Sequence, residues 1–74
     1  MVYDYSRLKG RIAARFGETG RFARAMKMSE KGLHKRLCGE KEWKQGEISR
    51  ASVLLGIDAK QIDVYFFTVK VQQN

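Results

Sequence analysis

The stretch TGRFARAMKMSEKGLHKRLCG, residues 19–39, decides the fold. It predicts two short helices joined by a turn at residues 27–29, with Ser29 as the N-cap of the second helix. Helices joined by so short a turn cross steeply, so the first braces the second and leaves its outer face free to enter a DNA groove. The apolar positions that hold the two helices together are Phe22, Ala23, Met26, Met28, Leu33 and Leu37.

The second of these helices carries its charges away from the core. At 100° per residue, Leu33 and Leu37 define the buried side, and Lys31 and Lys35 lie almost opposite. His34 and Arg36 are expected to flank the two lysines. Amines and imidazoles suit guanine edges and phosphates, so this face predicts contact with nucleic acid. The alternative is an ordinary solvated face.

The segments on either side predict supporting helices. The first runs from an N-cap at Asp4 to about Phe16 and ends at Gly17. Its apolar stripe consists of Tyr5, Leu8, Ile12 and Phe16. Thr19 is the expected cap of the next helix.

After residue 39 we expect two more helices. Trp43 is interpreted as a core plug whose indole N–H meets a carbonyl. A helix over about 44–55 turns Ile48, Ala51 and Leu55 inward and ends at Gly56, and its N-terminus beside Lys41 and Lys44 suits a phosphate. Asp58 opens the last helix, in which Gln61 completes a capping-box-like pattern. The apolar side of that helix consists of Ile62, Tyr65 and Phe66.

The tail, residues 67–74, has a different composition. Its β-branched residues Thr68, Val69 and Val71 favour an extended form. Three arrangements remain open: the tail lies across the domain, pairs with the same tail in a dimer, or stays loose. The fold class predicted is therefore all-α: a compact five-helix domain over residues 1–74 with a short extended C-terminal tail.

Composition limits the class of protein. The chain has 74 residues and one cysteine, so it forms a single domain without an intrachain disulfide. Residues 1–40 carry ten Lys/Arg against four Asp/Glu, and residues 41–74 carry five against four. A basic half predicts a polyanionic partner. Nucleic acid is the first expectation and an anionic membrane the second. With no signal peptide or membrane-spanning segment expected, the free Cys38 points to a reducing cytoplasm.

An enzyme is not expected. His34 and Cys38 stand four residues apart, but a Cys–His nucleophile also needs an orienting group and a sheltered pocket. The same pair supplies two ligands where a structural zinc site needs four. We therefore predict no catalytic residue, metal or cofactor.

Several stretches resemble the lambda-repressor-like (Cro/C1-type) helix-turn-helix family. More closely, the chain resembles short Cro-like phage regulators, a group that includes the modulator-of-repression proteins of temperate phages of Gram-positive bacteria. The stretches that carry the likeness are YDYSRLKGRI (3–12), FARAM (22–26), the Trp43-Lys44-Gln45 start of a helix, LLGI (54–57) and YFFTVKV (65–71). Two positions depart from the family pattern: Lys27 replaces the usual turn glycine, and an apolar residue comes one place late, at Leu37.

The resemblance implies a five-helix fold and a role in the lysis–lysogeny switch. It also implies one set of contacts to DNA bases and one set to DNA phosphates. The charge pattern of the sequence adds further residues to these sets. Expected base contacts are Ser29, Glu30, Lys31, His34 and Lys35. Expected phosphate contacts are Thr19, Gly20, Arg21, Arg24, Arg36, Lys41 and Lys44.

Two functions follow as hypotheses. The first is a sequence-specific regulator whose recognition helix enters the major groove of double-stranded operator DNA, as a homodimer on two half-sites or with a partner regulator. The second is an antirepressor, a modulator of repression that binds a phage CI-type repressor. Its basic face would then meet acidic groups, and the apolar tail would add an anchor.

Overall fold

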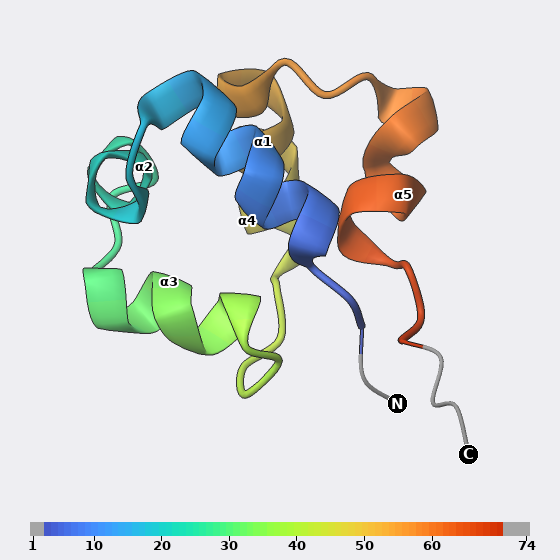
Figure 1. Cartoon of the computed structure of the whole chain (residues 1–74), viewed down its shortest axis with the longest axis horizontal. Helices are drawn as coiled ribbons and strands as arrows, with labels where there is room; N and C mark the ends of the chain where they lie inside the picture. Colours follow the sequence, from blue (N-terminus) through green and yellow to red (C-terminus); the bar gives the residue numbers. More distant parts are fainter. Residues whose placement is uncertain (1–2, 71–74) are drawn as a thin grey trace.

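The computed structural model describes residues 3–70 and is helical throughout, as predicted (Figure 1). Within this range the backbone forms no strand, only one isolated β-bridge. None of the helices described is long and apolar enough to cross a membrane. The elements are α1 (Ser6–Phe16), α2 (Thr19–Ala25), α3 (Glu30–Leu37), α4 (Gln45–Leu55), the 3₁₀-helix η1 (Ala59–Gln61) and α5 (Ile62–Phe66).

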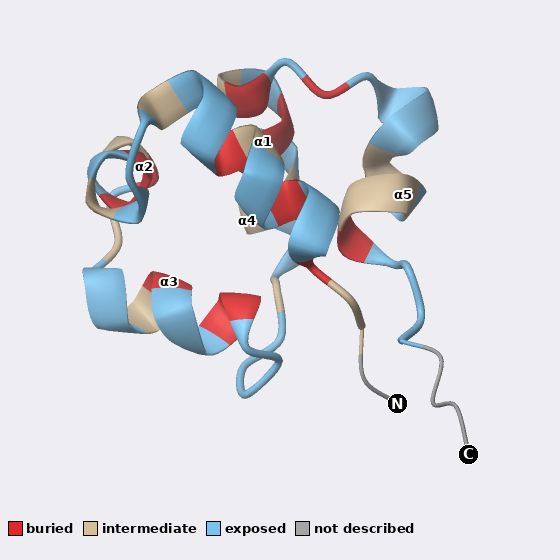
Figure 2. Ribbon diagram, viewed as in Figure 1, coloured by how far each residue is buried: buried red, intermediate tan, exposed pale blue. Residues whose placement is uncertain are grey.

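The core lies where the helices face one another (Figure 2). The stripe predicted on α1 is confirmed at Leu8 and Ile12, which are fully buried. Phe16, at the end of the stripe, is half-buried and packs its ring 5.2 Å from that of Phe22, centroid to centroid. The buried apolar residues are Tyr5, Leu8, Ile12, Phe22, Ala23, Met26, Leu33, Leu37, Ala51, Leu55, Ile57 and Phe66.

The start of α1 differs from the prediction by one residue. Tyr5, not Asp4, is the N-cap residue, and its side chain makes no capping bond. The Asp4 carboxylate still receives the N–H of Ser6 at 2.9 Å, so it satisfies one of the free donors of the first turn. At the other end, Gly17 closes the helix with a φ of 83°.

The turn between α2 and α3 has left-handed backbone at Lys27, where φ is 58°. This is the position where the family pattern has glycine, so the lysine accepts a conformation that strains any residue with a Cβ. The turn closes through a bond from Met28 N–H to the Ala23 carbonyl at 3.0 Å. Ser29 then caps α3, as predicted: its Oγ accepts the N–H of Gly32 at 3.0 Å.

The start of α2 is not capped as expected. Thr19 is already the first helical residue, and Glu18 stands at the N-cap without a side-chain capping bond.

Arg11 connects α1 to the end of α4. Its Nε donates to the Leu55 carbonyl at 2.9 Å, and Nη2 donates to the Gly56 carbonyl at 3.3 Å. A cation at this end suits both the unpaired carbonyls and the helix dipole. Gly56 itself adopts φ 66°, which ends α4 at the predicted residue.

The last helical segment is divided. The Asp58 carboxylate caps it by accepting the N–H of Lys60 at 3.2 Å, but the first turn is η1 rather than α-helix. The N–H of Gln61 bonds the carbonyl three residues back, at Asp58, over 2.8 Å. The side chain of Phe66, in α5, is fully buried.

Trp43 packs as a plug, but one part of the prediction is wrong. Its ring meets Phe66 edge-on, with centroids 5.2 Å apart and planes at 80°. The indole N–H is buried and finds no acceptor in the part of the chain that the structure describes. The ring is held by aromatic and apolar contact rather than by a bond to a carbonyl.

The described part of the tail lies beside the N-terminal segment (Figure 1). Tyr3 and Val69 form the antiparallel bridge, and Asp4 N–H donates to the Thr68 carbonyl at 2.7 Å. The rings of Tyr3 and Phe67 meet edge-on at 5.7 Å. The sequence left three arrangements open for the tail. The described part of the tail has the first of them, because it lies across the domain. The rest of the predicted tail, residues 71–74, is outside the described residues.

The turn gives the first prediction. Lys27→Gly raises the free energy of unfolding by about 0.5–1 kcal/mol, because glycine adopts the positive φ without strain and this gain exceeds its entropic cost. Urea denaturation measures the change. Lys31→Gly, an exposed position inside α3, is the control and should lower stability by about 1 kcal/mol. If both variants lost the same free energy of unfolding, the interpretation that the backbone is strained at Lys27 would be wrong.

Candidate functional site

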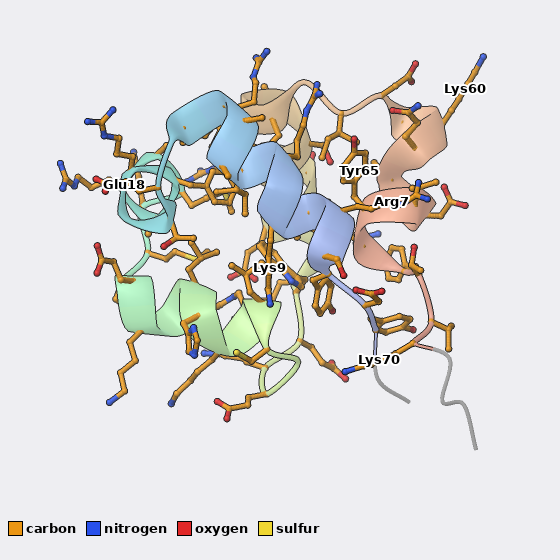
Figure 3. The ribbon with its side chains drawn as sticks, in the orientation of Figure 1. Arg7, Lys9, Glu18, Lys60, Tyr65 and Lys70 are labelled. Atoms are coloured by element: carbon orange, nitrogen blue, oxygen red, sulfur yellow. The ribbon has the colours of Figure 1, made fainter. Side chains whose placement is uncertain are left out.

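All five residues predicted to contact bases are exposed on α3 and its cap. Lys31 and Lys35 reach outward one helical turn apart. Ser29 is less available than the sequence suggested, because its hydroxyl oxygen caps the helix. Figure 3 shows long side chains with nitrogen tips extending from α2 and α3 into solvent.

His34 and Cys38 meet at the far end of the same helix. The distance from Cys38 Sγ to His34 Nε2 is 3.3 Å, and both residues are exposed. In residues 3–70, no group of three or more potential metal ligands gathers around this pair. The pair therefore lies on the surface at the C-terminal end of α3.

The predicted phosphate contacts divide into two groups. Arg21 and Arg24 project from α2, and Arg21 forms an exposed ion pair with Glu18 at 3.6 Å. Such an exposed pair is weak and leaves the arginine free to exchange partners. Thr19, Lys41 and Lys44 are also exposed, and Gly20 is half-buried.

Arg36 requires a correction. It was predicted to flank the outer lysines and contact phosphate, but only 7% of it is exposed. Three residues after Leu33, it falls on the inner side of α3, where its guanidinium makes a bidentate pair with Glu47 of α4 at 2.9 Å for both bonds. Its Nη1 donates to the Gly32 carbonyl at 2.8 Å. Arg36 fixes α3 against α4 and does not face solvent.

Glu47 has a second role at the start of α4. Its Oε1 accepts the N–H of Lys44 at 3.0 Å, so a carboxylate of the protein occupies the place where a phosphate was expected. Hydrogen bonds from the Arg36 guanidinium hold the pKa of Glu47 below its ordinary value, and the bond from Lys44 N–H acts in the same direction. The side chain is therefore an anion at neutral pH.

A second carboxylate lies at the start of α2. A Cβ added to Gly20 would overlap Glu30 Oε1, which places that carboxylate against the first turn of α2. Glu30 was predicted to contact bases, and from this position it instead adds negative charge beside the predicted phosphate contacts. Both helix starts nearest the basic surface thus carry acidic side chains.

The sequence interpretation missed a surface on the other half of the molecule, which we call the uncharged groove. It lies between α4 and the segment from Ile57 to Phe67 and encloses about 500 Å³. The signal was present in the sequence: Gln45, Ser49 and Val53 recur at every fourth position of α4. The residues that line the groove are Gln45, Ile48, Ser49, Ser52, Val53, Ile57, Ala59, Ile62 and Phe67.

Comparison with known proteins gives two similarities. The model of a family described as "Protein of unknown function (DUF739)" matches residues 1–69. The solution structure of the modulator of repression (MOR) of the temperate bacteriophage TP901-1 from Lactococcus lactis is similar over 97% of both chains. That similarity has a TM-score of 0.80 and 39% sequence identity. A search of curated proteins finds no match.

The Arg36–Glu47 pair gives the second prediction. Glu47→Gln lowers the free energy of unfolding by about 2–3 kcal/mol at neutral pH, because Arg36 is left buried without its counter-ion. A carboxyl whose pKa is lowered in the folded state stabilises the protein above its unfolded pKa, about 4.3, and this contribution is lost as pH falls through the folded pKa. The difference in free energy of unfolding between Glu47→Gln and the unmodified chain therefore becomes smaller as the pH falls.

Urea denaturation from neutral pH down to pH of about 3 tests this. Glu42→Gln, at an exposed position close in sequence, is the control and should change stability by less than about 0.5 kcal/mol. A difference between Glu47→Gln and the unmodified chain that stays constant with pH would contradict the role of the ionised carboxylate.

Proposed function

The chain belongs to the family of proteins of unknown function DUF739, and we propose that it acts as a phage antirepressor of the modulator-of-repression type. In this role it binds a phage CI-type repressor directly and takes part in the choice between lysis and lysogeny. The observation that carries the proposal is the similarity to the modulator of repression of bacteriophage TP901-1, at 39% identity over 97% of both chains.

The electrostatics of the α2–α3 surface support a protein partner. Affinity for DNA depends chiefly on cations that neutralise phosphates, often assisted by free N–H groups at helix starts. Here Glu47 binds the N–H at the start of α4, and Glu30 lies against the start of α2. Arg36 is withdrawn from the surface altogether. Each feature reduces the attraction for a phosphate backbone relative to what the net charge of +7 suggests.

A Cro-like regulator that binds operator DNA is the second candidate. One observation favours it: Lys31, His34 and Lys35 remain exposed together on α3, next to Arg21 and Arg24 of α2. In this candidate α3 enters the major groove, and two copies bind neighbouring half-sites. Direct readout by this surface would depend on Lys31, His34 and Lys35, because the hydroxyl oxygen of Ser29 is already bonded within the helix.

A titration against two ligands separates the candidates. The ligands are a purified phage CI-type repressor and double-stranded operator DNA that this repressor binds, each titrated over a range of salt concentrations. We expect direct binding to the repressor that changes little with salt, and binding to DNA that is weak and disappears as salt rises. The double variant Lys31→Ala, Lys35→Ala should keep its affinity for the repressor within about threefold.

The opposite pattern would support the second candidate. Tight binding to operator DNA without the repressor, with a steep salt dependence that the double variant abolishes, would overturn the antirepressor proposal. Glu40→Ala, an exposed change in the loop after α3, serves as the control and should leave both titrations unchanged.

A further inference from the structure

The uncharged groove differs chemically from the rest of this basic chain. None of its nine lining residues carries a charge, although the chain as a whole has a net charge of +7. Val53 projects from α4 with 80% of its surface exposed, and Phe67 at the end of the groove is 48% exposed. They are two of the three large hydrophobic residues that are exposed among residues 3–70. Exposed apolar side chains gathered at a groove are typical of an interaction site.

The floor of the groove suits close contact with another helix. Along α4, Gln45, Ser49 and Val53 lie on one face at intervals of four residues. Serine is small enough to let a second backbone approach. The hydroxyl of Ser52 already donates to the Ile48 carbonyl at 2.8 Å, so burying it leaves no unpaired donor. A groove between two helices with apolar walls is a shape that binds the apolar face of an amphipathic helix.

We infer that this groove binds an amphipathic helix of the phage repressor, an inference that rests on the proposed function. Charge decides between the available surfaces. A repressor that binds DNA presents cations to the phosphate backbone, and the α2–α3 surface with Lys31, Lys35 and Arg24 repels such a face. The uncharged groove carries no such penalty and offers apolar area. The repressor helix places its apolar side chains against Val53 and Phe67 and keeps its polar face in solvent.

A second copy of this chain fits the groove less well. Each copy carries a net charge of +7, so association brings two like-charged bodies together.

Two variants of one residue test the inference by isothermal titration against the same phage CI-type repressor at full length. Val53→Glu and Val53→Lys place opposite charges at an exposed site, where neither disturbs the core. We expect both to weaken binding by at least about tenfold, because either charge must be desolvated in the groove. Arg50→Glu, on α4 outside the groove, changes the charge by more than either and should stay within about threefold.

Four results would overturn the inference. Unchanged affinity in either Val53 variant would show that the groove is not the docking surface, while binding by the unmodified chain would leave the proposed function standing. Opposite shifts in the two variants would show that charge alone matters there. Sedimentation of the unmodified chain as a dimer that Val53→Glu dissociates would assign the groove to a second copy. No binding by the unmodified chain would instead overturn the proposed function, and the inference with it.

Discussion

The ion pair between Arg36 and Glu47 is the interaction on which the arrangement of the surface depends. It joins α3 to α4 through two bonds of 2.9 Å and ties the guanidinium to the Gly32 carbonyl as well. A buried charge is costly unless all its donors are used, and here the carboxylate also caps α4. One pair therefore sets the position of α3, completes the start of α4 and removes one cation from the surface. Lys31 and Lys35 of the same helix face outward, because they lie opposite the buried Leu33 and Leu37.

Two surfaces of different chemistry result from this arrangement. The exposed side of α2 and α3 is basic, with acidic residues at the helix starts that moderate its attraction for phosphate. The uncharged groove is built by α4 and the segment up to Phe67. The charge imbalance between the two halves of the sequence corresponds to this division, since the excess of cations lies in residues 1–40. This small domain therefore carries a basic surface and an uncharged groove on different helices.

Much of the fold was predictable because it depends on local signals. Apolar spacing identified the core face of α1, and Gly17, Ser29 and Gly56 marked helix ends through backbone geometry that few other residues satisfy. The candidate site was less predictable, because its decisive contacts join residues distant in sequence. Nothing in the neighbourhood of Arg36 reveals Glu47, eleven positions away, and a periodicity argument placed the arginine on a flank. The pairing of Tyr3 with Val69 is more distant still. Among the described residues, the indole N–H of Trp43 has no acceptor, and its ring packs edge-on against Phe66, a contact between positions 23 residues apart.

Electrostatics make the combination of surfaces intelligible for a protein that acts on a repressor. A competitor for the DNA-binding face of a repressor has to associate with a basic protein, and a basic competitor is repelled at long range unless salt screens the charges. Screening acts over about 8 Å at physiological ionic strength, so contact through an uncharged surface leaves mainly short-range apolar contact to stabilise the complex. In the proposed complex Val53 and Phe67 would supply that contact. They lie in the part of the chain whose charges nearly cancel, since residues 41–74 carry five cations and four anions. Under this proposal, specificity for the repressor comes from the shape of the groove rather than from the net charge of the chain.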